Sequence, residues 1–407
     1  MVNSRSNLLS KHLKFNYSIV NWIRTSLFIF FFYALMQITS WIPLRYWKAG
    51  DGKFGDLFQV LKWSDCYKVI GVNIYENNPG EICSNYIYGF QLMRVLSKTG
   101  ITASDTYFLG FAFMLLFSVV LGLIASKVKH VFKYVLILPI VLSPPLLLLI
   151  ERGNLDILVF ILLFVSTSLF YIGFEKFALF PLMLAAITKF YAAPIFLVYL
   201  IFNRNYRNKL FTFIVLLVST ANILFDLERI KTDFPKGGSG FFGMSVWARY
   251  LEIPAPNHVL SEEMNNLVGL FIFITLFGTI LYFVKKDSIV TLNNFAMLPS
   301  NIYYFYFSVF LIVHLSCFIT GVSFDYRLIY IIFAASCFMI SYERHLFNAV
   351  SRLVYILLLI SVWHSFPSDG LQPIGDLALE ILTIILGISF VINFKKLCRL
   401  LANRNHK

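Results

Sequence analysis

The sequence predicts an all-helical protein that crosses a membrane many times. Of its 407 residues, 58% are hydrophobic and only 14% are charged, a composition that no soluble domain shows. Apolar runs long enough to cross a bilayer alternate with polar connectors. Most of the Lys and Arg behind the net charge of +13 lie in those connectors, as in membrane proteins. We therefore expect membrane lipids, and no nucleic acid, as partners of a single integral-membrane domain over residues 1–407.

The first predicted span covers about residues 26–42. Basic residues from Arg5 to Arg24 precede it, as in a signal peptide. The apolar run is, however, longer than the core of a signal peptide, and no small-x-small cleavage site follows. We expect a retained span with a cytoplasmic N-terminus, followed on the outer face by a long polar loop, residues 43–104.

Three further spans are predicted at about residues 106–125, 132–150 and 154–173. The connector 126–133 is basic and should lie in the cytoplasm. The connector 151–154 therefore returns to the outer face.

The apolar run 177–203 has two possible structures, because Lys189 lies at its centre and Pro194 follows. As one span, it would place the basic C-terminal tail on the outer face. As two short helices that turn near Lys189, it keeps the tail and most later basic connectors in the cytoplasm, so we predict this broken pair. Helices of about 12 residues reach only ~18 Å, so the turn would stop inside the membrane and line a cavity.

Six more spans complete a bundle of about 12 helices with both termini in the cytoplasm. They are predicted at about residues 209–225, 266–284, 302–319, 326–342, 350–364 and 376–394. A second long outer loop, residues 226–265, lies among them.

The first outer loop carries the candidate catalytic residue, Asp56. Apolar side chains recur at helical spacing from Leu57 to Tyr67, which predicts a short amphipathic helix on the membrane surface. Asp56 stands where this helix begins, so it can cap the helix N-terminus. It can also act as a general base that accepts the proton of an incoming hydroxyl. The two roles are compatible, because capping uses only one carboxylate oxygen.

A polar junction between two spans carries further candidates. Its sequence is Glu151-Arg152-Gly153-Asn154-Leu155-Asp156. Charged groups are costly in hydrocarbon, so we expect them to face a water-filled cavity; the alternative is a loop that reaches into the lipid headgroups.

Three cations lie at outer helix ends or within a span, Arg152, Lys189 and Arg327. They either pair with the neighbouring acids, Asp325 in the case of Arg327, or clamp a phosphate. We favour the clamp for Arg152 and Lys189.

Cysteines and histidines add no metal site. Cys66 and Cys83 share the first outer loop, where they either form a disulfide in an oxidising space or stay as free thiols. His314 is expected to be a packing group within a span. No set of acids, His and Cys has metal-ligand spacing, so neither a metal nor a cofactor is predicted.

Several segments together resemble the GT-C superfamily of integral-membrane glycosyltransferases, and glycosyltransferase family 87 most of all. The segments are Gly55-Asp56, Gly71-Val72-Asn73-Ile74-Tyr75, Asn85-Tyr86-Ile87-Tyr88-Gly89, Glu151 to Asp156, Lys189 to Pro194, and Phe324-Asp325-Tyr326-Arg327. Two features depart from the family pattern. The Tyr86-Ile87-Tyr88 turn lacks the usual proline, and four residues separate Lys189 from Pro194.

The resemblance implies a hexosyl- or pentosyltransferase in the plasma (inner) membrane. It would move a sugar from a polyprenyl-phosphate donor to a glycan or glycolipid acceptor at the extracytoplasmic face, with inversion, in cell-envelope or exopolysaccharide synthesis. Asp56 would be the base, and the substrate-binding residues would be Arg152, Asn154, Asp156, Lys189, Asp325 and Arg327. The alternatives are a transporter or flippase of lipid-linked glycans, which should show two related halves, and a polysaccharide polymerase.

Overall fold

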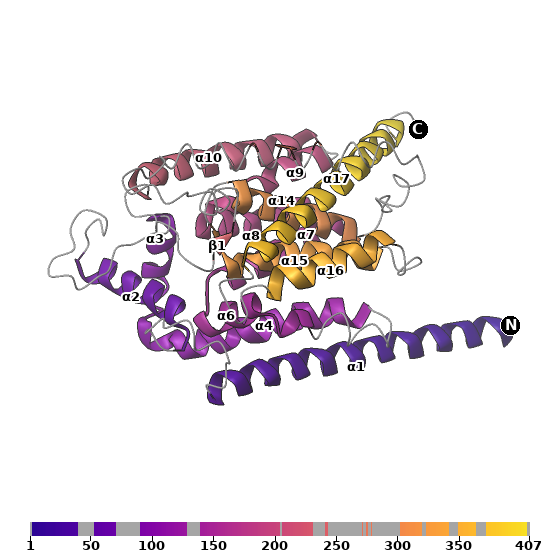
Figure 1. Cartoon of the computed structure of the whole chain (residues 1–407), viewed down its shortest axis with the longest axis horizontal. Helices are drawn as coiled ribbons and strands as arrows, with labels where there is room; N and C mark the ends of the chain where they lie inside the picture. The colour runs from indigo at the N-terminus through magenta and orange to yellow at the C-terminus, as the bar shows by residue number, and fades with distance from the viewer. Residues whose placement is uncertain are drawn as a thin grey trace. The chain divides into compact units, whose positions relative to one another are not determined.

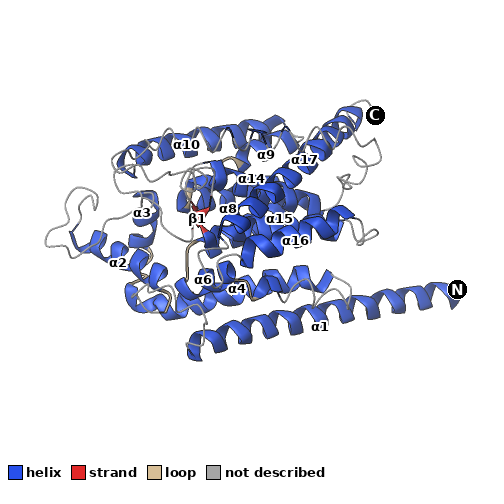
Figure 2. Ribbon diagram, viewed as in Figure 1, coloured by secondary structure: helices blue, strands red, loops and turns tan. Residues whose placement is uncertain are grey.

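The structure, a computed structural model, describes most of the predicted spans (Figure 1). The described residues are 2–39, 53–70, 90–127, 139–203, 206–230, 302–319, 323–341, 349–363 and 372–404, with a few positions between 241 and 278. Within them the regular secondary structure is helical apart from β1 (Phe241–Phe242) and β2 (Ser323–Phe324), which pair antiparallel (Figure 2). The prediction of an all-helical fold is therefore confirmed for this part of the chain.

The chain divides into two compact units. The first comprises Met1–Ser84 and Met93–Ile161, and the second comprises Asn85–Leu92 and Leu162–Lys407. That residues 1–407 form a single domain stays a prediction.

Five elements lie wholly within the first unit. They are α1 (Val2–Thr39), α2 (Gly55–Ile70), the short 3-10 helix η2 (Ala103–Asp105), α4 (Thr106–Lys127) and α6 (Pro144–Arg152). The sequences of α3 (Phe90–Lys98) and α7 (Asp156–Tyr171) begin in one unit and end in the other.

The second unit holds the remaining helices. They are α8 (Glu175–Thr188), η3 (Phe190–Ala192), α9 (Ile195–Phe202), α10 (Tyr206–Ile230), α14 (Ile302–Ile319), η4 (Asp325–Leu328), α15 (Ile329–Ser341), α16 (Ala349–Trp363) and α17 (Gln372–Arg404).

Among the described residues, four helical stretches are long and apolar enough to cross a membrane. They are Ile19–Ile38, Ala103–Ser126, Ile302–Ile319 and Pro373–Phe394. Other predicted spans appear as the shorter apolar helices α7, α9, α15 and α16. The span predicted at 266–284 lies outside the described residues apart from isolated positions. The total of about 12 helices and the cytoplasmic termini stay predictions.

The burial pattern of α1 fits a helix with one face in lipid. Phe28, Phe31, Leu35 and Ile38 recur every three or four residues and are exposed. Gln37 and the other buried residues lie on the remaining surface, where polar groups find partners. The Gln37 side-chain amide, for example, donates a hydrogen bond to the carbonyl oxygen of Ile150 at 2.9 Å.

Helices α1 and α4 run side by side in the first unit (Figure 1). They pack tightly at Gly122, where an added β-carbon would lie 2.1 Å from the Ser26 hydroxyl oxygen and 2.9 Å from the Ser26 backbone. The Trp22 indole N–H also donates to the Val119 carbonyl oxygen across this interface. The small residue at Gly122 lets the two backbones approach, as in other membrane helix pairs.

The single span predicted at 132–150 is wrong as one continuous helix. The helical segment after residue 138 ends before Ser143, which is extended (φ −64°, ψ 142°), and α6 then starts at Pro144. A residue before proline avoids the helical conformation, and proline fits the first position of a new helix. Pro144 and Pro145 therefore break the run.

The broken pair predicted for 177–203 is confirmed at Lys189. Helix α8 ends at Thr188, Lys189 is extended (φ −147°, ψ 118°), and α9 begins after Pro194. That the chain turns back to the cytoplasmic face there stays a prediction.

Adding a methyl group at Gly122, where α1 and α4 pack tightly, should destabilise the first unit. We expect Gly122→Ala to lower the free energy of unfolding by about 1–3 kcal/mol, because the new β-carbon overlaps the Ser26 backbone. Gly387→Ala in α17 is the matched control, since nothing lies within 4 Å of the added β-carbon there. Thermal unfolding in detergent measures both variants, and equal midpoints would contradict the expectation.

Candidate functional site

Three of the predicted site residues meet in the first unit. The Arg152 guanidinium donates a hydrogen bond through Nε to Oδ1 of Asp56 at 2.7 Å, and its Nη2 forms an ion pair with the same oxygen at 2.5 Å. The Asn154 side-chain amide donates to the other carboxylate oxygen, Oδ2, at 2.5 Å. The Asp56 side chain is 11% exposed and that of Arg152 is 28% exposed. The structure thus holds the carboxylate by both oxygens at the edge of the protein interior.

This pairing of Arg152 is one that sequence analysis did not weigh. The sequence suggested the neighbouring acids or a phosphate as partners of Arg152, whereas its partner in the structure is the carboxylate of Asp56. The two residues are 96 positions apart, so no local pattern relates them.

The end of α6 explains how Arg152 and Asn154 come to face Asp56. Helix α6 ends at Arg152, and Gly153 adopts the left-handed conformation (φ 57°, ψ 36°) that glycine favours. The chain then turns sharply, and the Asn154 carbonyl side-chain oxygen accepts a hydrogen bond from the Asp156 backbone N–H at 2.9 Å. The Asn154 side-chain oxygen therefore accepts a hydrogen bond at the start of α7, and its NH2 group donates one to Asp56.

Asp156 is the first residue of α7 and its side chain is fully buried. A carboxylate in the first turn of a helix is favoured by the helix dipole. Asp56 likewise lies in the first turn of α2, which begins one residue earlier at Gly55. The predicted surface helix is confirmed as a helix, with Leu57, Val60 and Leu61 buried.

Phe54 lies directly before α2 and is a residue that sequence analysis missed. Its backbone is left-handed (φ 58°), a conformation that costs a non-glycine residue about 1–2 kcal/mol. Its N–H donates to the Glu151 carbonyl oxygen at 2.8 Å, and its ring is buried. The ring packs edge-on against Phe111 and Tyr107 of α4. The sequence carries no signal for it, because a left-handed backbone at a phenylalanine depends on tertiary packing and not on a local residue pattern.

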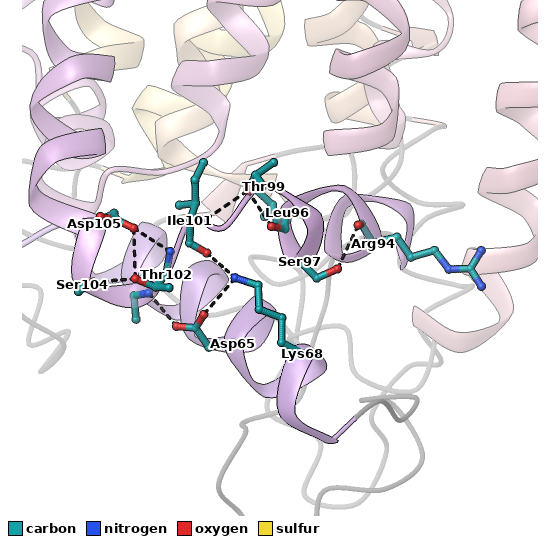
Figure 3. Close-up of polar contacts among 11 residues, drawn as sticks. Asp65, Lys68, Arg94, Leu96, Ser97, Thr99, Ile101, Thr102, Ser104 and Asp105 are labelled. Carbon is teal, nitrogen blue, oxygen red and sulfur yellow. Dashed lines mark hydrogen bonds and ion pairs between the residues drawn. The ribbon is translucent and has the colours of Figure 1, made fainter.

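The other end of α2 is tied to the connector before α4 (Figure 3). The Asp65 carboxylate accepts a hydrogen bond from the Ala103 N–H at 2.8 Å, and Lys68 donates to the Ile101 carbonyl oxygen at 2.9 Å. Asp65 and Lys68 also form an ion pair at 3.6 Å. Asp65 thus has a structural role at the start of η2.

Cys66, one residue beyond Asp65, is disulfide-bonded. The partner predicted for it, Cys83, lies outside the described residues. A disulfide forms and persists in an oxidising compartment.

Two of the predicted cations lie in the second unit. Lys189 is buried (7% exposed) at the break between α8 and η3. Arg327 is in η4, where its guanidinium carbon lies 5.1 Å from the centre of the Tyr191 ring, a cation–π geometry. The Tyr191 hydroxyl is 3.4 Å from that of Tyr330. Since Tyr191 follows Lys189 by two residues, this contact brings the two positively charged segments together.

Asp325 begins η4, two residues before Arg327, and the structure describes its backbone only. The prediction that all seven site residues meet in one pocket requires residues of both units. It stays a prediction.

A second set of buried polar residues was also missed. Asp376, Glu380 and Thr383 lie on α17 at intervals of four and three residues, so they share one face of the helix. All three are buried, and the Thr383 hydroxyl is 3.0 Å from Nε2 of His314 in α14. The spacing of two acids within an apolar run was the available signal.

The Asp56–Arg152 contact should contribute measurably to stability. In a double-mutant cycle with Asp56→Asn and Arg152→Gln, we expect a coupling of about 1–2 kcal/mol, because the contact is partly buried and uses two N–H groups. The Asp65–Lys68 pair is the control, with Asp65→Asn and Lys68→Gln. Its side chains are 33% and 26% exposed and 3.6 Å apart, so about 0.5 kcal/mol or less is expected.

Denaturant titration in mixed micelles gives the free energies for both cycles. A coupling for Asp56 and Arg152 no larger than that of the control pair would show that the contact is absent in the folded protein.

No protein-family model, curated protein or solved structure matches this chain. The resemblance to GT-C glycosyltransferases therefore stays a prediction that rests on the segments quoted above. Of these, the described residues include Gly55-Asp56, the 151–156 junction, Lys189 to Pro194 and Phe324 to Arg327.

Proposed function

We propose that the protein is an integral-membrane glycosyltransferase of the GT-C type. It transfers a sugar from a polyprenyl-phosphate donor to a hydroxyl of a glycan or glycolipid acceptor at the extracytoplasmic face of the plasma membrane. The observation that carries the proposal is the Asp56 carboxylate, which Arg152 and Asn154 hold at the start of a helix in a membrane protein.

Asp56 is the general base. A carboxylate offers about four lone-pair sites, so the bonds from Arg152 and Asn154 leave it able to accept a proton. The same bonds fix the orientation of the carboxylate, which a base needs if it is to meet one particular hydroxyl. Its partial exposure gives a substrate access to it.

In the proposed step, the acceptor hydroxyl oxygen forms a bond with the anomeric carbon of the donor sugar. The bond between that carbon and the phosphate oxygen breaks with its electron pair, and polyprenyl phosphate leaves. The hydroxyl proton moves to Asp56. Because attack and departure occur on opposite faces of the carbon, the configuration inverts.

Cations stabilise the leaving phosphate. A guanidinium carries five N–H groups, and the contact with Asp56 uses two of them, so Arg152 has the capacity to hold the base and touch a phosphate together. Lys189 and Arg327 complete the clamp in this proposal, with Asn154, Asp156 and Asp325 orienting the sugar or the cations. Positive charge placed where negative charge develops is a large source of catalysis.

Two observations support the outer face. The bond at Cys66 fits an oxidising space for α2, and the basic connectors of the sequence fit a cytoplasmic location for the opposite ends of the helices. A bundle of about 12 helices with both termini in the cytoplasm is part of the proposal.

The second candidate function is a transporter or flippase of lipid-linked glycans. The buried acids of α17 and His314 favour it, because ionisable residues inside a membrane often line a path for protons or substrates. It predicts movement of an intact lipid-linked glycan across vesicles without bond cleavage. Transfer or release of sugar by the purified protein separates the two functions.

Replacing the base should abolish transfer without preventing insertion. With the protein in lipid nanodiscs and a panel of polyprenyl-phosphate sugars, we expect Asp56→Asn to lower the rate by about 10²–10⁴-fold, because no group accepts the hydroxyl proton. Asp65→Asn is the control on the same helix. Its amide oxygen still accepts from the Ala103 N–H, so its rate should stay within about threefold of wild type.

Full activity of a normally inserted Asp56→Asn protein would remove Asp56 from the mechanism. Absence of transfer and of sugar release by the wild-type protein, across the whole panel, would contradict the proposed function.

Removing a cation of the clamp should reduce kcat more than it raises KM, because the phosphate gains charge as it leaves. We expect Lys189→Gln and Arg327→Gln each to lower kcat/KM by about 10–100-fold, which corresponds to about 1.4–2.8 kcal/mol. Lys68→Gln, at the far end of α2, is the control and should have little effect. Steady-state kinetics with donor as the varied substrate measures all three, and unchanged constants for both clamp variants would exclude them from the site.

A further inference from the structure

We propose that Phe54 is a positioning residue for the Asp56 carboxylate. Its ring acts as a wedge that fixes where α2 begins, and so holds Asp56 against Arg152 and Asn154. The inference rests on the proposed function only in naming Asp56 as a base. The placement of the carboxylate itself is measurable without any transfer assay.

The wedge fills a space that two glycines leave open. A β-carbon added at Gly110 of α4 would lie 2.6 Å from ring carbons of Phe54, and one added at Gly153 would lie 3.0 Å from the ring. The ring therefore occupies the place of a side chain at Gly110, and it lies tightly against Gly153, whose φ of 57° also favours glycine. Tyr107 and Phe111 close the ring in from α4, with centroid separations of 6.2 and 5.5 Å.

The backbone of Phe54 joins the two segments that carry the ion pair. Its N–H donates to the Glu151 carbonyl oxygen, in the last turn of α6, and its own carbonyl oxygen accepts from the Phe58 N–H, in the first turn of α2. Arg152 is the next residue after Glu151, and Asp56 is two residues after Phe54. The register of the Asp56–Arg152 pair is therefore set at Phe54.

The backbone conformation at Phe54 indicates that its ring has a functional role. Glycine would adopt a φ of 58° without the steric cost that phenylalanine bears. Strained residues cluster at functional sites, where the surrounding structure holds them. Here the ring supplies contacts that hold the strained backbone, with Tyr107 and Phe111 and against Gly110 and Gly153.

The first measurement reports the position of residue 56 directly. In Asp56→Cys, a thiol takes the place of the carboxylate beside Arg152, where the nearby guanidinium favours the reactive thiolate. The rate of its alkylation by iodoacetamide, followed by mass spectrometry of the peptide, then measures proximity to Arg152. Adding Arg152→Gln sets the lower limit of the rate.

The variants separate the ring from the backbone. We expect Phe54→Ala and Phe54→Gly, each combined with Asp56→Cys, to lower the alkylation rate by about fivefold or more, toward the limit set by Arg152→Gln. Phe54→Gly relieves the strained φ but removes the ring, so a loss in both variants assigns the effect to the ring. Phe117→Ala is the matched control, because Phe117 is an equally buried phenylalanine of the same unit that packs on Tyr33 and Phe160.

A second pair of variants keeps the test decisive if one protein folds poorly. Gly110→Ala places a methyl group against the ring and should lower the alkylation rate as Phe54→Ala does. Because removing the ring removes the overlap, Gly110→Ala combined with Phe54→Ala should be no worse than Phe54→Ala alone. Non-additivity of this kind is the mark of two residues in contact.

The transfer assay supplies an independent readout. With Asp56 intact, Phe54→Ala should lower kcat by about tenfold or more while donor KM stays within about twofold, because the base is displaced and the donor site is not. An alkylation rate equal to that of the Asp56→Cys parent in both Phe54→Ala and Gly110→Ala would overturn the inference. A lowered alkylation rate in a protein that transfers no sugar would support the wedge and overturn the proposed function.

Discussion

A charged group that is taken out of water needs a partner, and in this protein that constraint joins distant parts of the chain. Asp56 and Arg152 form an ion pair, and the Asn154 amide donates a hydrogen bond to the other carboxylate oxygen of Asp56. Breaking a buried charge pair is far more costly than never forming it, because the remaining charge is left without compensation. The contact therefore fixes α2 to the end of α6, and Phe54, Gly110 and Gly153 are arranged around that junction. The other anchors of α2, at Asp65 and Lys68, hold its far end.

Local patterns in the sequence predicted much of the local structure. The helical run after Gly55, the break at Lys189 and the span at 302–319 follow from hydrophobic periodicity, from an isolated charge and from apolar length, and all three appear in the structure. The proline pair at Pro144 and Pro145 was an equally local signal, and the predicted continuous span there overlooked it. Apolar length alone does not make a helix when the backbone lacks a donor.

What the sequence could not reveal was long-range pairing. The candidates Asp56, Arg152 and Asn154 were identified by residue type, but their mutual contact joins positions almost 100 residues apart. The left-handed Phe54 and the link from His314 to Thr383 are of the same kind, since each depends on a neighbour that only tertiary packing supplies. Residue chemistry thus singled out Asp56, Arg152 and Asn154 one by one, and tertiary packing brought them into contact.

The break at Lys189 also bears on how the chain enters the bilayer during synthesis. A lysine at the centre of a segment opposes insertion by about 2.5–3.5 kcal/mol, whereas each Leu, Ile, Phe or Val favours it by about 0.3–0.6. Helix α9 has the sequence Ile-Phe-Leu-Val-Tyr-Leu-Ile-Phe. Together these residues favour insertion by about 2–4 kcal/mol, which nearly cancels the cost of Lys189. The apolarity of α9 thus offsets most of the insertion cost of Lys189.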